Sequence, residues 1–170
     1  MLISKSLQPR GFFSLTRQLY HMHQNGNGVA QDFMRATAWH SKATEQRYAD
    51  AQNNLGLMYQ DGNGVTQSYE QAVVWYRKAA EQGHADAQNN LGLMYQNGYG
   101  VSQDYEQAAA WYRKAAEQGH ANAQYSLGWM YENGYGVGKS TEQAVEWYRK
   151  AAAQGNTNAK GALKDFPNHS

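Results

Sequence analysis

Cysteine is absent from this chain of 170 residues, and proline occurs only twice. Without cysteine, the chain has no disulfide framework, no thiolate zinc site and no cysteine nucleophile. The 15 lysines and arginines almost balance the 14 aspartates and glutamates, so the excess positive charge that binds nucleic acids and anionic membranes is missing as well. We therefore expect no nucleic acid among its partners.

Long apolar runs are missing too. The apolar stretch from Phe12 to Leu15, which follows Lys5 and Arg10, is shorter than the roughly 7 to 15 residues of a signal-peptide core. No stretch approaches the roughly 20 apolar residues of a membrane-spanning helix. These absences predict a cytoplasmic chain that does not insert into a membrane.

Glycine, by contrast, is abundant, and its 17 residues recur at fixed intervals. The sequence matches itself at an offset of 36 residues, as four alanines show: Ala51, Ala87, Ala123 and Ala159. Residues 49–60 recur unchanged at 85–96, and residues 75–85 recur unchanged at 111–121. Such a period predicts an array of stacked repeats, in which each unit buries its apolar face against its neighbours.

Each unit carries two helical patterns. Apolar residues at helical spacing predict a first helix, helix A, that ends near Gly62, and a second, helix B, that ends at Gly83. Residue pairs with the spacing of a capping box mark the start of helix B: Ser68 with Gln71, Asp104 with Gln107, and Ser140 with Gln143. The aromatic residues of helix B are expected to fill the space between helices: Trp75, Tyr76, Trp111, Tyr112, Trp147 and Tyr148.

A glycine lies inside each predicted helix A, at positions 56, 92 and 128. Glycine there costs about 1 kcal/mol relative to alanine, so a close approach of helix B must offset the loss. We expect the small helix B residues Ala72, Ala108 and Ala144 to meet the bare glycine backbone. On that packing, Gly92→Leu would unfold or splay the central repeat.

The patterns AxxxLGxMYxxGxGV and AxxWYRKAAxQG resemble those of the Sel1-like repeat family, which is similar to tetratricopeptide repeats. The resemblance is close over residues 49–155. It implies an all-α fold, a right-handed α/α superhelix (solenoid) of four helix-turn-helix repeats at about residues 15–50, 51–86, 87–122 and 123–158. A flexible segment, residues 1–14, should precede this single domain of residues 15–166, and a capping helix, residues 158–166, should close it. The resemblance also implies a non-catalytic adaptor or scaffold that binds a protein or peptide.

The first repeat departs from the family pattern. Tyr20 stands where the family has the helix A glycine, and His23 stands where it has a tyrosine. A tyrosine does not fit a glycine-sized crossing, so we expect the first helical pair to be opened or shifted. A homodimer through this irregular repeat stays open as an alternative.

In a solenoid of helical pairs, the A helices line the concave face. Helix A residues that do not contact helix B should therefore form a partner-binding groove: Asn53, Leu57, Gln60, Asn89, Leu93, Gln96, Tyr125, Trp129 and Glu132. Tyr125 and Trp129 break the internal symmetry of the array, and aromatic residues are common binding hot spots. Packing of Trp129 on the C-terminal helix, near Leu163 and Phe166, is the alternative.

No catalytic residue, metal or cofactor is predicted. His84 and His120 lie in adjacent repeats, and helices about 8 to 10 Å apart hold them too far from each other to share a metal. The pair His21 and His40 is left open as a metal site. Acidic residues recur in the first turn of helix B, where they suit the helix dipole: Glu70, Glu106 and Glu142. The basic residues of helix B are expected to be solvated: Arg77, Lys78, Arg113, Lys114, Arg149 and Lys150.

A second function stays open beside the interaction module. The 13 tyrosines and 5 tryptophans, together with the resemblance, allow a cell-envelope hydrolase or carbohydrate-binding protein related to cysteine-rich Sel1-like proteins. The absence of cysteine separates this chain from that branch. The alternative would also require export and a ligand pocket.

Overall fold

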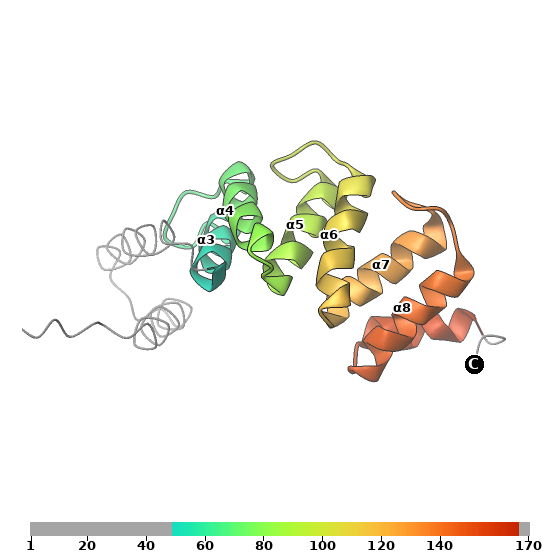
Figure 1. Ribbon diagram of the computed structural model, residues 1–170. Coiled ribbons are helices and arrows are strands. Elements are labelled where there is room, and N and C mark those ends of the chain that lie inside the picture. The colour runs from blue at the N-terminus through green and yellow to red at the C-terminus, as the bar shows by residue number, and fades with distance from the viewer. Residues whose placement is uncertain (1–48, 167–170) are drawn as a thin grey trace, which may run out of the picture.

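The structure, a computed structural model, describes residues 49–166, and this part of the chain is entirely helical (Figure 1). Its elements are α3 (Ala49–Asp61), α4 (Tyr69–Glu81), α5 (Ala85–Asn97), α6 (Tyr105–Glu117), α7 (Ala121–Asn133), α8 (Thr141–Ala153), α9 (Thr157–Ala162) and the 3-10 helix η1 (Leu163–Asp165). Helices α3, α5 and α7 are A helices, and α4, α6 and α8 are B helices. Each A helix packs on the B helix that follows it, and each B helix packs on the next helix along the chain. The predicted all-α fold of tandem helical pairs is confirmed.

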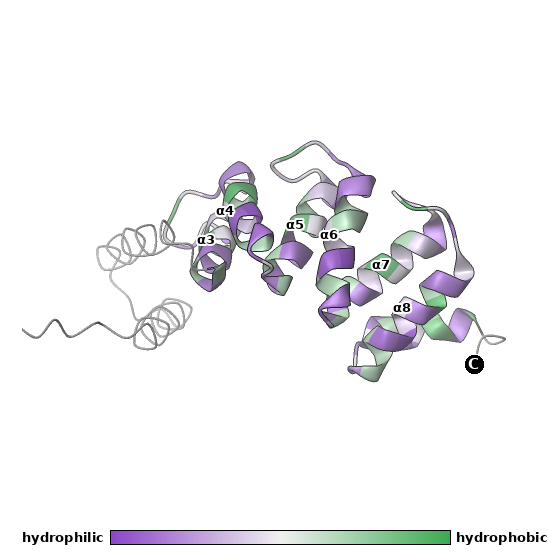
Figure 2. Cartoon of the chain, viewed as in Figure 1, coloured by the Kyte–Doolittle hydropathy of each residue, from purple (hydrophilic) through white to green (hydrophobic). Residues whose placement is uncertain are grey.

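The expectations for segment 1–14, for the first repeat with Tyr20 and for the pair His21 and His40 concern residues outside the described range. None of the described helices is both long and apolar enough to cross a membrane. Hydrophobic and hydrophilic residues alternate along the helices (Figure 2), as expected where one face of a helix packs inward and the other meets water.

The B helices begin at side-chain caps, as predicted. Only one of the two hydrogen bonds of a capping box is present, the one that the cap side chain accepts. The side-chain oxygens of Ser68, Asp104 and Ser140 accept hydrogen bonds from the backbone N–H three residues later, at 3.2, 2.9 and 3.3 Å. The N–H of each cap residue donates to a carbonyl of the preceding A helix instead of to a glutamine side chain, as Ser68 does to Tyr59 at 2.9 Å. The loop between the helices is therefore tied back to helix A.

The predicted close approach of helix B to the helix A glycines is confirmed, and tyrosine rings are the nearest groups. A Cβ built on Gly92 would lie 2.8 Å from ring carbons of Tyr112. The same holds for Gly56 with Tyr76. At Gly128 the Tyr148 ring is again the nearest group, and the Ala144 carbonyl oxygen lies 3.1 Å away. The glycine makes room for a buried ring, because each of these three tyrosines is at most 1% exposed.

The hydrophobic core is shared between neighbouring repeats. One cluster contains buried residues of α4 between positions 72 and 80, together with Leu91 and Met94 of α5 and Trp111 of α6. The next cluster repeats this arrangement with α6, α7 and Trp147 of α8. No repeat of the described range encloses a core alone, which is the arrangement that the 36-residue period implied.

The glycine-rich loop of one repeat rests on helix B of the repeat before. Gly100 has a φ of +67°, and a Cβ on it would overlap the backbone of Tyr69 at the start of α4. Beside this contact the rings of Tyr69 and Tyr99 stack at a centroid distance of 5.0 Å. The corresponding rings Tyr105 and Tyr135 stack at 4.9 Å. The loops therefore hold consecutive repeats together in addition to the helices.

Two arginines of helix B differ from the prediction that they would be solvated. Nη2 of Arg77 donates to the hydroxyl of Tyr95 on the next A helix at 2.6 Å, and its guanidinium carbon lies 5.7 Å from the centre of that ring. Arg113 makes the same pair of contacts with Tyr131, at 2.6 and 5.6 Å. The lysines of helix B are exposed and lie over the tryptophan rings of their own helices: Lys78, Lys114 and Lys150.

Candidate interaction surface on the A helices

The nine predicted groove residues differ in burial and in the groups that they contact. At the centre of the A helices, Leu93 is 37% exposed, and Leu57 and Trp129 at the same register are half-buried. These three side chains form a row across α3, α5 and α7, which we call the A-helix row. Tyr125 and Asn89 are also half-buried. Leu93 is the only one of the nine predicted residues that is exposed.

The residues at the ends of the A helices face helix B, contrary to the expectation that they would point away from it. The Tyr76 hydroxyl donates to Gln60 Oε1 and the Tyr112 hydroxyl to Gln96 Oε1, both at 2.8 Å. Glu132 takes the same place in the last repeat and accepts from Tyr148. These three residues therefore satisfy the buried tyrosines that fill the glycine crossings.

Two of these tyrosines are held strongly in the neutral form. Burial raises the pKa of Tyr148 far above the ordinary value of a phenol, and the hydrogen bond to Glu132 and its negative charge raise it further. Burial also raises the pKa of Tyr112, and a hydrogen bond with Ser126 offsets a small part of that rise. Both hydroxyls therefore keep their protons near neutral pH and donate hydrogen bonds to Gln96 and Glu132.

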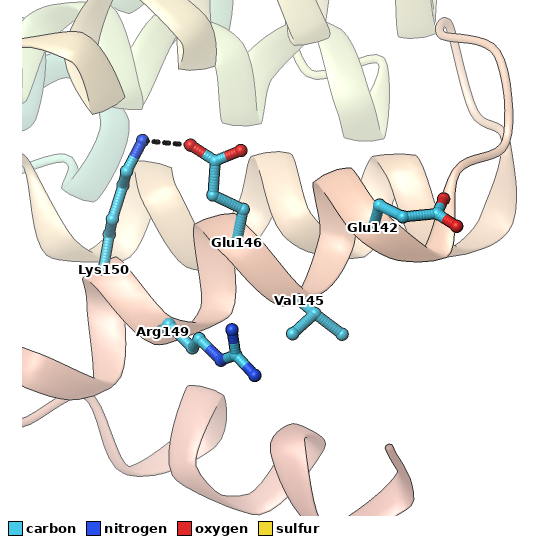
Figure 3. A pocket seen from close by; sticks show the side chains of 5 residues that line it. All are labelled: Glu142, Val145, Glu146, Arg149 and Lys150. Atoms are coloured by element: carbon cyan, nitrogen blue, oxygen red, sulfur yellow. Dashed lines mark hydrogen bonds and ion pairs between the residues drawn. The ribbon is translucent and has the colours of Figure 1, made fainter. Parts of the chain in front are cut away.

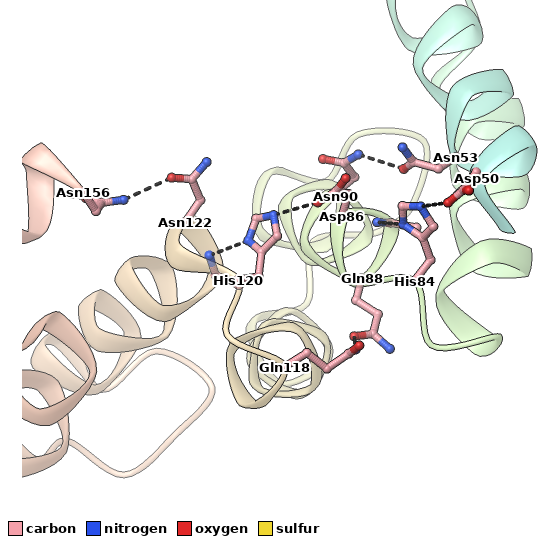
Figure 4. A network of polar contacts seen from close by, with 12 residues as sticks. Asp50, Asn53, His84, Asp86, Gln88, Asn90, Gln118, His120, Asn122 and Asn156 are labelled. Carbon is pink, nitrogen blue, oxygen red and sulfur yellow. Dashed lines mark hydrogen bonds and ion pairs between the residues drawn. The ribbon is translucent and has the colours of Figure 1, made fainter. Parts of the chain in front are cut away.

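The asparagines of the predicted groove lie deeper than expected. Asn53 is only 6% exposed, and its Oδ1 accepts from Nδ2 of Asn90 at 3.2 Å (Figure 4). The amide of Asn53 is thus used between two A helices, so the prediction that it faces a partner does not fit its position. The Oδ1 of Asn89 is buried and makes no hydrogen bond.

Tyr125 and Trp129, the aromatic residues that break the internal symmetry, both lie in the fourth repeat. Trp129 lies against the loop residue Tyr135, with ring centres 5.1 Å apart, and Tyr125 lies 5.6 Å from Tyr148. Trp129 also packs against the same buried cluster as Leu163 and Phe166, and this cluster includes Ala159 of α9. Because Trp129 is still half-buried rather than enclosed, this packing fixes the ring and leaves part of it on the surface.

Two features of this surface were not predicted from the sequence. One turn beyond the A-helix row, the exposed residues Asp61, Asn97 and Asn133 extend it; their spacing of four residues from the row could have revealed them. The A helices also contain no lysine or arginine, whereas each contains at least one acidic residue: Asp50, Asp61, Asp86 and Glu132. Glu132 accepts from Tyr148, Asp50 and Asp86 lie against His84 and His120, and Asp61 is exposed at the end of α3. The exposed carboxylates therefore lie toward the ends of the A helices.

The histidines of the described range cap helices. Nδ1 of His120 accepts the N–H of Ala123 at 3.1 Å, and Nε2 lies 3.1 Å from Asp86 Oδ1 of the previous A helix (Figure 4). His84 makes equivalent contacts with Ala87 and Asp50. Among residues 49–166, no three His, Cys, Asp or Glu side chains come together in a way that could hold a metal ion.

Four consecutive segments of the chain match the Sel1 repeat: residues 21–48, 49–84, 85–120 and 121–156. The chain belongs to the Sel1 repeat family. Each of the last three Sel1 repeats holds one complete helical pair, and α9 with η1 follows the fourth repeat. No curated protein matches the chain.

Solved structures of Sel1-like repeat proteins share the fold. The crystal structure of a protective antigen present in uropathogenic Escherichia coli strains, described as having an SLR fold, is 44% identical, with a TM-score of 0.79 over 87% of this chain and 32% of that one. A Sel1 repeat protein from Oxalobacter formigenes is 38% identical, with a TM-score of 0.75 over 88% of this chain and 61% of that one. Cysteine rich protein B of Helicobacter pylori is 29% identical, with a TM-score of 0.62 over 81% of this chain and 99% of that one. The chain thus spans less than two thirds of the first two Sel1-like structures.

Proposed function

We propose that this Sel1 repeat protein is a non-catalytic adaptor that binds a peptide or protein partner through the A-helix row. The main support for this proposal is the A-helix row. Leu57, Leu93 and Trp129 occupy one register on three successive A helices, and Leu93 is 37% exposed although it lies among buried helix residues. Leu57 and Trp129 also pack in part on the core clusters, but stacking does not require the exposed apolar side chain of Leu93.

The charge around the row favours a partner segment that carries lysine or arginine beside its apolar side chains. Asp50, Asp61 and Asp86 are exposed carboxylates on A helices that contain no lysine or arginine, and complementary charges guide association and select partners. Trp129 and Tyr125 supply large, stiff aromatic surfaces of the kind that dominates binding energy. The proposed site is therefore an apolar row with an aromatic end in the fourth repeat and with exposed carboxylates toward the ends of the A helices.

A capture experiment with matched variants tests this proposal. Proteins retained by the wild-type chain from a lysate of its own cells would be identified by mass spectrometry and compared with those retained by Trp129→Ala and Leu93→Asp. We expect both variants to lose the specific partner. Val74→Asp is the control, because Val74 is 43% exposed on a B helix and the change is of the same kind. Retention of every partner by both row variants, or equal loss with the control, would refute the proposal.

The place of action is part of the proposal as well. We propose that the chain acts in the cytoplasm, and fractionation followed by immunodetection tests this directly. Recovery from the cell envelope would favour the alternative of an exported hydrolase or carbohydrate-binding protein.

A further inference from the structure

The arginine–tyrosine contacts between repeats show how a B helix of this chain receives a phenol ring. On α4, Arg77 donates to the hydroxyl of Tyr95 at 2.6 Å while its guanidinium lies over the ring. On α6, Arg113 holds Tyr131 with the same geometry. In both cases the tyrosine belongs to the next A helix, and both arginines are half-buried by the contact.

The last B helix of the described range, α8, has the corresponding arginine, and no tyrosine among residues 49–166 bonds to it. The residue 36 positions after Tyr131 is a proline, at position 167, and helix α9 ends at Ala162. Phe166 packs on the last core cluster where the other repeats have a methionine, at Met94 and Met130. Arg149, the counterpart of Arg77 and Arg113, is exposed.

A cavity that is open to solvent lies at this position on α8. Its volume is 460 Å³, and it is lined by five residues of this one helix: Glu142, Val145, Glu146, Arg149 and Lys150 (Figure 3). Lys150 is held aside by Glu146 at 2.7 Å. The guanidinium of Arg149, in contrast, makes no ion pair among the described residues.

We infer that the α8 cavity is a docking site for a tyrosine side chain on a helix of a partner protein. The chemistry is that of the two contacts inside this chain: a charged N–H donor for the phenol oxygen, a cation over the ring, and the side of a B helix beneath. The site lies on a B helix and contains no residue of the A-helix row. It is therefore independent of the proposed adaptor surface.

Small probes separate the role of the hydroxyl from that of the ring. We would titrate the 15N-labelled chain with p-cresol, which is the tyrosine side chain alone, and with toluene, which lacks the hydroxyl. Saturable amide shifts confined to α8 and α9 are expected with p-cresol, with affinity several-fold above that of toluene. Arg149→Met should abolish this preference, and Arg77→Met should not, because Tyr95 already fills the Arg77 site. Equal affinity for the two probes, or shifts on other helices, would rule out the site.

A helical probe tests the partner itself. A helix-constrained peptide that copies residues 121–137, which include Tyr131, would be compared with the same peptide carrying Tyr131→Phe. Loss of one charge-assisted hydrogen bond should weaken binding about tenfold. The same loss is expected when the tyrosine peptide meets the Arg149→Met chain. Equal binding of both peptides by the wild-type chain would overturn the inference even if p-cresol binds.

Discussion

At Gly92, the ring of Tyr112 occupies the space that a Cβ would need, 2.8 Å from its ideal position. Gly92→Ala would gain about 1 kcal/mol of helix propensity but would push a buried ring out of place, which typically costs about 1 to 3 kcal/mol. We expect a net loss in the free energy of unfolding, measured by urea denaturation. Gly161→Ala is the matched control in α9, because nothing lies within 4 Å of its Cβ, and it should stabilise the chain. A gain in both variants would contradict the ring-against-glycine packing.

The same tyrosines predict a loss of stability in alkaline solution. The pKa values of Tyr112 and Tyr148 are raised above the ordinary value of 10.0, so above about pH 10 the unfolded chain releases these protons while the folded chain keeps them. The two tyrosines leave the free energy of unfolding unchanged well below pH 10. Above pH 10 they lower it, by up to about 1.4 kcal/mol per pH unit for each tyrosine. Urea denaturation from pH 8 to 11 measures the fall. Tyr148→Phe should be less stable at neutral pH but should lose stability less steeply above pH 10; parallel curves would contradict the assignment.

Between elements, the glycine-rich loop contacts the start of α4 at Gly100. The contribution of this contact to stability can be measured separately from the strain of a positive φ. Gly100 and Gly119 both have positive φ, +67° and +90°, but only a Cβ on Gly100 would overlap another repeat, at the Tyr69 backbone. Gly119→Ala should cost only the strain of the conformation, about 1 to 2 kcal/mol. Gly100→Ala should cost clearly more, because α4 and the loop must separate. Thermal unfolding of the two variants gives the comparison, and equal melting temperatures would show that the loop contact adds nothing.

The elements themselves could be read from the sequence because their signals are local. Helical spacing, the Ser68 and Asp104 caps and the loop glycines each act within about ten residues, and all of them were predicted. The half capping box was missed because the competing acceptor, the Tyr59 carbonyl, lies nine residues away on another helix. Predicting that bond requires knowledge of how the loop folds back.

Contacts between repeats were harder to predict, because they depend on the stacking angle rather than on the period. The tyrosine partner of Gly92 lies 20 residues away on helix B, on the same face as Ala108, and the pattern does not choose between them. The buried glutamines Gln88 and Gln124 were missed although a signal existed. An uncharged polar residue that recurs on the apolar face of every helix A indicates a buried hydrogen bond.

Over the whole molecule, these glutamines connect the repeats into one array. Gln88 is 4% exposed on α5; its Nε2 donates to the Ala80 carbonyl of α4 at 3.1 Å, and its Oε1 accepts from Gln118, the residue that follows α6, at 2.7 Å. Gln124 repeats both bonds one repeat later, with Ala116 and Gln154. Neighbouring repeats are thus joined by polar groups that are buried from water as well as by apolar area, and each joint affects only the two repeats that it connects.

Amide hydrogen exchange can locate the effect of breaking one joint. Gln88→Leu removes the hydrogen bond from Nε2 to the Ala80 carbonyl. The Gly83 N–H still donates to that carbonyl at 3.0 Å, so the loss should be about 1 kcal/mol, and the weakened contact lies between α4 and α5. Because coupling in such arrays passes between neighbours, protection should fall most in α3 and α4 and least in α7 and α8. Gln124→Leu is the matched variant, and the loss should move toward α7 and α8. A uniform fall along the chain in both variants would mean that the helical pairs open as one cooperative unit, and the pairwise description of this array would then be wrong.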